Sequence, residues 1–351
     1  MKKVSLAIMI LVLGLATKSY TRDQIKIVGS STVYPFATVV AERFGKISGF
    51  KTPVIESTGS GGGLKLFCNG LGTQHPDIAN ASRRIKSKEV KRCEKNGVTD
   101  ITEIKIGFDG IALANAKSGP NLELSLKEVY LALAKDVPEN SSGKTVKPNP
   151  YKMWNEINPN LPATPIIVIG PPPTSGTRDA FNELAIEKGC ESFPARRSLK
   201  SKNKILYKKE CRAIREDGPY VEAGENDNLI IEKLVSDPSA IGVFGYSFLD
   251  QNKDKVKAAK IDGIFPELKN ISSGQYPVSR SLFFYVKNAH ASVIPGIKQY
   301  LREFTSSKAI GSEGYLLSKG LVPLPEAERA KFEKDGKDFA KFDESSLKKK
   351  K

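Results

Sequence analysis

The sequence predicts an α/β fold of two domains, and three observations lead to this prediction. The chain has 351 residues, whereas a single hydrophobic core rarely organises more than about 250 to 300. Short apolar runs alternate with amphipathic segments, as in β-α-β units whose strands are mainly parallel. Two further segments, 104–114 and 282–286, look extended and could cross between domains. We therefore expect mixed, mainly parallel sheets joined by a hinge of crossing strands.

The first domain is predicted from its apolar periodicity. Three short apolar runs read as strands, and helical spacing of apolar residues follows the first of them. The strands are expected at 25–28, 54–55 and 78–79, with helices at 36–44 and from Leu64.

The second domain begins at about residue 113 and repeats this pattern, with a loop rich in Pro, Asn, Ser and Gly after its first helix. Helices are expected at 126–133, 181–185 and 228–235, and strands at 166–169 and 241–244. A helix at 294–304 follows the return crossing, and the charged tail from Pro325 reads as a helix with a solvated end. We expect domain I to comprise 20–112 with 275–351, and domain II to comprise 113–274.

The N-terminus has the pattern of a secretory signal. Lys2 and Lys3 precede an apolar run at 4–16, and polar residues return at Thr17. The run is shorter than the roughly 20 residues that a membrane span needs. No cysteine precedes Cys68, so a lipid-anchoring cysteine is not expected. We expect a signal peptide at about 1–19 and a periplasmic protein.

Export makes disulfides the first interpretation of the four cysteines. Nearest-neighbour pairing gives Cys68–Cys93 and Cys190–Cys211, each closing a loop worth roughly 3 kcal/mol in the chain-entropy model. A zinc site is the alternative, but it requires closely spaced ligands. The two histidines, His75 and His290, are far apart in the sequence and are expected at the surface.

The formal net charge of +16 makes the surface strongly cationic, so anions are attracted. Nucleic acid is not expected as a partner, because the positive charge is scattered rather than interleaved with aromatic residues. The basic stretch between Cys190 and Cys211 has no assigned role.

Three turns share one pattern, in which an apolar strand is followed by small and hydroxyl residues and then by a helix. They lie at 29–32, 57–63 and 174–177. A helix start presents unpaired N–H groups and the positive end of the helix dipole, and glycine lets an oxyanion approach the backbone. Each turn alone could be a simple helix cap. Three of them, divided between two α/β halves, favour an anion site at the carboxyl ends of the strands.

Nucleotide hydrolysis and ester hydrolysis are less favoured. The glycine stretch continues Gly63-Leu64-Lys65 without the ending of a P-loop. Ser60 is flanked directly by glycines, which does not match a nucleophile elbow. His290 could still reach a serine as a base in the folded chain, so an exported ester hydrolase stays open as an alternative.

Four motifs together resemble the periplasmic phosphate-binding proteins of the Pst ABC transporters, over nearly the whole mature chain. They are 29–35 (GSSTVYP), 59–65 (GSGGGLK), 77–83 (DIANASR) and 175–178 (SGTR). The resemblance implies the two-domain periplasmic-binding-protein fold, with one phosphate in the cleft at the hinge. It also implies a monomeric receptor rather than an enzyme, without a cofactor, that delivers phosphate to an inner-membrane ABC permease.

The resemblance also implies a set of ligand contacts. These are Ser31, Thr32, Val33, Ser60, Ser82, Arg83, Ser175, Gly176, Thr177 and Arg178. Better-known relatives have an aspartate where Arg83 stands and an arginine where Pro171 stands. We therefore expect Arg83 to supply the main positive charge, with Arg178 as the alternative.

The aspartate of those relatives accepts the proton of the bound phosphate, and Asp109 is the residue here that could take over this role. Sulfate, phosphite, arsenate or a phosphonate remain alternative ligands.

Overall fold

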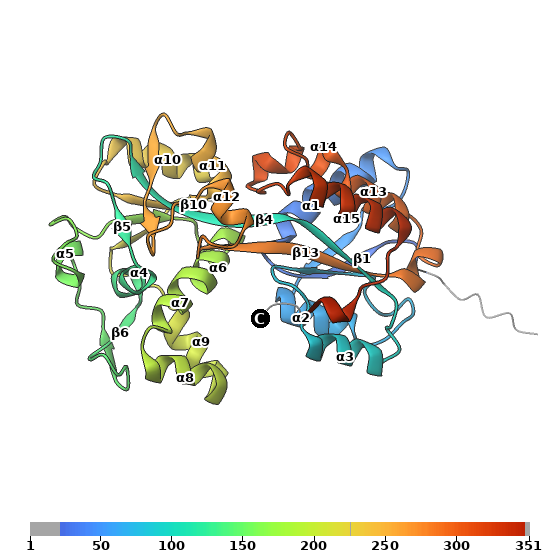
Figure 1. The fold of residues 1–351 in the computed structure, drawn as a ribbon, viewed down its shortest axis with the longest axis horizontal. Helices are drawn as coiled ribbons and strands as arrows, with labels where there is room; N and C mark the ends of the chain where they lie inside the picture. The colour runs from blue at the N-terminus through green and yellow to red at the C-terminus, as the bar shows by residue number, and fades with distance from the viewer. Residues whose placement is uncertain (1–21, 225, 348–351) are drawn as a thin grey trace, which may run out of the picture.

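The chain begins as three β-α units at one end of the molecule. The computed structural model describes residues 22–224 and 226–347 (Figure 1). The expected signal peptide lies outside the described residues. The first units are β1 (Lys26–Gly29), α1 (Tyr34–Ile47), β2 (Val54–Ser57), α2 (Gly59–Phe67), β3 (Ile78–Ala81) and α3 (Ser87–Lys95). β1 pairs in parallel with both β2 and β3.

Helix α1 shows why these segments fold as expected. Pro35 stands in the first helical turn, where its missing N–H and fixed φ are tolerated. Phe36, Val40 and Phe44 then recur on one side and are buried. Burial of each such side chain contributes roughly 1.5 to 3 kcal/mol. The ring of Phe44 meets Tyr300 edge-on at 5.6 Å, which fastens α1 to a helix near the C-terminus.

Strand β4 (Ile101–Ala116) is continuous over 16 residues and links the two ends of the molecule. It pairs antiparallel with β13 (Ser279–Lys287) through residues 101–110 and with β10 (Ile241–Gly245) through 111–114. Figure 1 shows β4 and β13 running between two groups of helices and strands. The two extended segments expected at 104–114 and 282–286 lie within these strands.

We call the group around β1 the first lobe and the group around β8 the second lobe. The second lobe is formed mainly by residues between the two crossing strands. Its helices are α4 (Leu126–Leu133), α5 (Trp154–Ile157), α6 (Gly176–Phe181), the π-helix η1 (Asn182–Ile186), α7 (Glu187–Cys190), α8 (Pro194–Lys202), α9 (Lys204–Arg212), α10 (Asp227–Ser236), α11 (Tyr246–Gln251) and α12 (Leu268–Ser272). Its strands are β5 (Glu123–Leu124), β6 (Asp136–Pro138), β7 (Val146–Pro148), β8 (Val168–Gly170), β9 (Tyr220–Glu222), β10, β11 (Val256–Ala258) and β12 (Lys260–Ile261).

After β13 the chain stays in the first lobe. It forms η2 (Asn288–Ser292), α13 (Ile297–Thr305), α14 (Ser307–Ile310), η3 (Tyr315–Lys319), α15 (Glu326–Asp338) and η4 (Glu344–Leu347). The helix expected in the charged tail is therefore present as α15. The last four lysines, 348–351, lie outside the described residues.

The sheet is mixed, as expected. Its strand order is β2-β1-β3-β13-β4-β10-β8-β9, and β11 also pairs with β4. β10, β8 and β9 are parallel to one another, whereas the crossing strands pair antiparallel with their neighbours. The division at 112/113 and 274/275 remains a prediction. Within residues 22–224 and 226–347, no helix combines the length and hydropathy needed to cross a membrane.

Both expected disulfides, Cys68–Cys93 and Cys190–Cys211, are present. The second closes the basic stretch, which folds as the helix pair α8 and α9. The expectation of surface histidines is wrong for His290, which is buried. Its Nδ1 lies 2.7 Å from the carboxylate of Asp77, which also binds the Arg22 guanidinium. A buried carboxylate requires such partners, and position 290 supplies one from the far end of the chain.

Replacing Cys190 and Cys211 by alanine should lower the free energy of unfolding by about 3 kcal/mol, because the bond cross-links residues 21 positions apart and restricts the unfolded chain. Denaturant titration of the oxidised wild type and the double variant measures the difference. Superimposable unfolding curves would show that this bond contributes nothing to stability.

Candidate functional site

Three strand-to-helix turns lie side by side in the first lobe. β2, β1 and β3 are neighbouring parallel strands, so their carboxyl ends share one edge of the sheet. The turns leading into α1, α2 and α3 therefore meet at this edge. Gly29 makes the close approach there possible, since it has φ +133° and an added Cβ would lie 2.1 Å from the Asn80 carbonyl oxygen.

The fourth turn comes from the second lobe and touches the first. Ser175 caps α6, its Oγ accepting from the Thr177 N–H at 3.1 Å. A Cβ on Gly176 would lie 3.1 Å from the Ser31 carbonyl oxygen and 3.2 Å from Thr32 Cα, so a larger residue would push the turns apart. Ser31 Oγ also donates to Asp179 Oδ2 at 2.7 Å. The predicted residues of the first and fourth turns are thus brought together.

These turns border a cleft of about 900 Å³ between the lobes. Asp109 of β4 lies at the cleft, as do residues of the α1, α6, α10 and η3 regions. The lining residues are Ser31, Thr32, Tyr34, Pro35, Phe36, Thr38, Val39, Asp109, Thr174, Ser175, Gly176, Thr177, Asn226, Asp227, Asn228, Gly245, Phe248, Ser318, Lys319 and Gly320.

Arg280 of β13 joins the parts of this site. Its guanidinium donates to the hydroxyl of Thr32, to Asp109 Oδ2 at 3.3 Å and to Glu183 Oε2 at 2.6 Å. Only 9% of its side chain is exposed. One arginine therefore binds the first lobe, a crossing strand and the second lobe. Sequence reasoning missed Arg280 and Glu183, which lie outside the recognised motifs.

The carboxylates around the cleft differ in electrostatic environment. Burial raises the pKa of Asp109, although Arg280 opposes this. Burial also raises the pKa of Asp227 to about 6; the Gly245 N–H opposes the shift and the charge of Asp109 adds to it. For Glu183 burial acts in the same direction, but Arg280 and Arg212 outweigh it and hold its pKa below the ordinary value. The two carboxylates that line the cleft, Asp109 and Asp227, therefore hold protons more tightly than usual, whereas Glu183 behind Arg280 holds its proton less tightly.

The predicted residues of the second and third turns meet each other. The hydroxyl oxygens of Ser60 and Ser82 are 3.1 Å apart, and the Ser82 N–H donates to Ser60 Oγ at 3.0 Å. Ser82 and Arg83 line a second cavity, of about 850 Å³, which Arg280 also lines. Arg280 is not among the described residues that line the 900 Å³ cleft, and it reaches that cleft through its hydrogen bonds to the lining residues Thr32 and Asp109.

The two arginines expected near the anion have other partners. Arg83 forms a bidentate pair with Glu89, at 2.9 and 2.7 Å. Arg178 is buried, lies over the ring of Tyr220 at 4.1 Å and donates to the Pro171 carbonyl at 3.0 Å. Neither is among the described residues that line the 900 Å³ cleft.

Val33 and His290 complete the predicted set. Val33 is fully buried at the start of α1, where its N–H lies 3.4 Å from Ser30 Oγ. His290 Nε2 accepts from the Gly72 N–H at 3.1 Å while Nδ1 binds Asp77. Because both ring nitrogens are engaged there, His290 is not placed as a base for a cleft serine.

Two lobes, crossing strands and a cleft edged by strand-to-helix turns are the architecture of a solute-binding protein. The model of the PBP superfamily domain matches residues 16–308. The chain belongs to this superfamily, and the resemblance to the Pst phosphate-binding proteins is confirmed.

Curated relatives are similar along most of their length. The protein SphX of Synechococcus elongatus is 31% identical over 303 residues, which cover 85% of this chain and 76% of that protein. The phosphate-binding protein PstS of Staphylococcus saprophyticus is 27% identical over 345 residues, covering 95% of this chain and 92% of the relative.

Solved structures show the same fold. A possible phosphate-binding protein from Planctomyces limnophilus has a TM-score of 0.69 at 24% identity, covering 91% of this chain and 99% of the other. PstS from Borrelia burgdorferi has a TM-score of 0.55 at 19% identity, and the match covers 87% of this chain and 100% of the other. The predicted periplasmic-binding-protein fold is confirmed.

Replacing Asp227 by asparagine should stabilise the protein more at pH 7.5 than at pH 4. Its pKa of about 6 lies above the value of 3.8 for an unburied group, so the folded state binds more protons. The stability that protonated Asp227 contributes is therefore present at pH 4 and lost as pH rises through 6. Asparagine keeps an acceptor for the Gly245 N–H without the charge.

Denaturant unfolding of wild type and variant at both pH values measures this effect, which should be on the order of 2 kcal/mol. A variant that gains no stability relative to wild type on going from pH 4 to pH 7.5 would exclude a raised pKa at Asp227.

Proposed function

We propose that the protein is a periplasmic receptor that binds inorganic phosphate between its lobes and delivers it to an ABC permease. The contact of the first-lobe turn at Ser31 and Thr32 with the second-lobe turn at Gly176 carries this proposal. It brings two helix starts to one point beside Asp109 and Arg280. The names of the relatives support phosphate as the ligand.

The donors at this point suit a tetrahedral oxyanion. Enclosing an anion away from water costs several kcal/mol unless hydrogen bonds and opposite charge replace its hydration. Hydroxyl groups of Thr32, Ser175 and Thr177, at the starts of α1 and α6, supply the hydrogen bonds, and the positive ends of the two helix dipoles favour an anion there. Ser60 and Ser82 supply further donors from the neighbouring turns. Because the contacts come from both lobes, binding favours the closed form.

Arg280 is the strongest candidate for the compensating charge. Its guanidinium already reaches Thr32, the last residue of the first turn. Arg83, the residue expected from the sequence, lies 3.9 Å from the position of a Cβ on Gly61, at the start of α2, and stays a second candidate. An arginine at either position suits this role, because its planar guanidinium can donate to two oxygens of the anion at once.

Asp109 is the proposed acceptor of the phosphate proton. Its carboxylate borders the cleft and binds Arg280, so it can face the anion. A carboxylate accepts a hydrogen bond from a protonated phosphate oxygen but repels fully ionised sulfate. Such an acceptor gives selectivity for phosphate or arsenate over sulfate, and it disfavours ligands without an ionisable OH.

The receptor role fixes the expected partners. The apolar N-terminus supports export through a signal peptide at about 1–19, and the relatives named PstS support an inner-membrane ABC permease as partner. The proposed receptor acts as a monomer and requires no cofactor.

Calorimetry with a panel of anions tests the ligand. Phosphate should bind with 1:1 stoichiometry and arsenate comparably, whereas sulfate and phosphite should bind about ten- to a hundredfold more weakly, since an unpaired buried charge or donor costs about 1.5 to 3 kcal/mol. Asp109→Asn should reduce the difference between the affinities for phosphate and for sulfate. Tighter binding of sulfate or a phosphonate than of phosphate would reassign the ligand.

Alanine variants of three arginines test the source of charge. Arg280→Ala should weaken phosphate binding by about tenfold or more, the loss expected for a charged hydrogen bond. Arg280→Lys should recover part of the affinity, because it keeps the charge without the fork. We expect a smaller loss from Arg83→Ala and near-wild-type binding by Arg178→Ala, the matched control.

Because Arg280 also pairs with two carboxylates, its loss could destabilise the fold itself. Thermal unfolding of each variant distinguishes a loss of binding from a loss of folding. If Arg83→Ala abolishes binding while Arg280→Ala leaves it intact, the charge belongs to Arg83, as the sequence predicted.

A further inference from the structure

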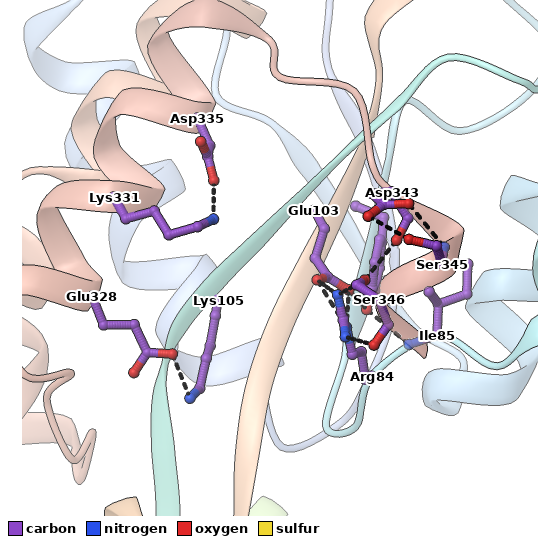
Figure 2. A network of polar contacts seen from close by, with 11 residues as sticks. Arg84, Ile85, Glu103, Lys105, Glu328, Lys331, Asp335, Asp343, Ser345 and Ser346 are labelled. Atoms are coloured by element: carbon purple, nitrogen blue, oxygen red, sulfur yellow. Dashed lines mark hydrogen bonds and ion pairs between the residues drawn. The ribbon is translucent and has the colours of Figure 1, made fainter. Parts of the chain in front are cut away.

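The C-terminal segment 339–347, here called the C-terminal strap, binds the loop that carries Ser82. The side chain of Arg84 lies between this loop and the strap (Figure 2). Arg84 Nη2 donates to Ser346 Oγ at 2.7 Å, and Nη1 donates to the Ser346 carbonyl at 3.2 Å. Its guanidinium also lies over the ring of Phe342 at 5.4 Å.

The carboxylate of Glu103, on β4, holds this loop in place. Arg84 Nε and Nη2 both donate to Glu103, at 2.7 to 3.0 Å. The Ile85 N–H donates to the Tyr285 hydroxyl at 2.8 Å, and that hydroxyl donates to Glu103 at 2.8 Å. Two successive loop residues are thus tied to one side chain, of which only 8% is exposed.

The strap has its own attachment to the first lobe. The Phe342 N–H donates to the Ile101 carbonyl at 2.7 Å, at the start of β4. The ring of Phe342 meets Tyr285 edge-on at 6.4 Å, and Phe342 and Leu347 pack on the apolar cluster beneath α2 and α3. Phe342, Tyr285 and Glu103 therefore form a fixed frame for Arg84.

Ser82, which the proposed function takes as a contact of the anion, lies only two residues before Arg84 and lines the 850 Å³ cavity. Ser82 is 8% exposed, and its N–H and hydroxyl both meet Ser60. A shift of Arg84 would move Ser82 relative to Ser60, because the short loop transmits the displacement. Loops that are fixed before binding lose less conformational entropy when the ligand arrives.

We propose that the C-terminal strap, acting through Arg84, positions Ser82 and is a working part of the anion site. Arg84 is in this sense a positioning residue, which acts on the ligand through Ser82. The inference rests on the proposed function, since it takes Ser82 as a contact of the bound phosphate.

A double-mutant cycle between Arg84 and Ser82 tests the inference, with phosphate affinity measured by calorimetry. Arg84→Ala should raise the Kd about tenfold in the otherwise wild-type protein. In the Ser82→Ala background the same change should alter the Kd less than about twofold, because Ser82 no longer transmits it. Ser346→Ala should weaken binding severalfold, and Arg84→Lys should fall between Arg84→Ala and wild type.

Lys331→Ala is the matched control. Lys331 lines the same 850 Å³ cavity, but its ion pair is with Asp335 on its own helix α15 (Figure 2). Its loss should leave phosphate affinity unchanged. If Arg84→Ala does not fold, Ser346→Ala and Arg84→Lys give the same cycle with Ser82→Ala.

If Arg84→Ala raises the Kd for phosphate by the same factor with and without Ser82→Ala, the two residues act independently and the inference is overturned. Unchanged phosphate affinity in Arg84→Ala would overturn it as well. A wild-type protein that binds no phosphate would instead contradict the proposed function itself.

Discussion

The interaction on which the site depends is the set of hydrogen bonds made by Arg280. Its guanidinium binds Thr32 of the first lobe, Asp109 of a crossing strand and Glu183 of the second lobe. A nearly buried arginine is stable only when its charge and donors are matched, so these groups are held in fixed relative positions. Loss of Asp109 or Glu183 would leave this nearly buried charge with a single carboxylate partner.

The rest of the fold brings those partners to the arginine. β13 carries Arg280 beside β4, with Arg280 directly opposite Asp109 in the antiparallel register. The π-helix that continues α6 contains Glu183, and such wide turns often occur at functional sites. Ser31 and Asp179 add a second hydrogen bond between the lobes. The hydrogen bonds that hold the two lobes together therefore come from the same elements that present the proposed anion donors.

Local patterns predicted most of the elements and both disulfides because their causes are local. Apolar periodicity marks α1, α4 and α10, and loop length favours neighbouring cysteines as partners. The strand-to-helix turns could be recognised for the same reason. Arg280 could not, since it lies in the polar first residues of β13 without any motif, and its partner Thr32 is 248 positions away.

The other features that the sequence did not predict also depend on contacts between residues outside any one local pattern. His290 looked like a surface residue because nothing near it in the sequence shows that Asp77 needs a buried partner. The Arg83–Glu89 pair spans six positions across a loop and a helix start, a spacing that no helical rule anticipates. The strap contact between Arg84 and Ser346 joins residues 262 positions apart.

The central claim is that one anion lies where the turns of the two lobes meet. A crystal structure of the protein with phosphate tests it most directly. We predict a tetrahedral density within hydrogen-bond distance of both the Thr32 turn and the Gly176 turn, with Arg280 as a ligand. Density bound to one lobe alone, with the other lobe's turn empty, would contradict the claim.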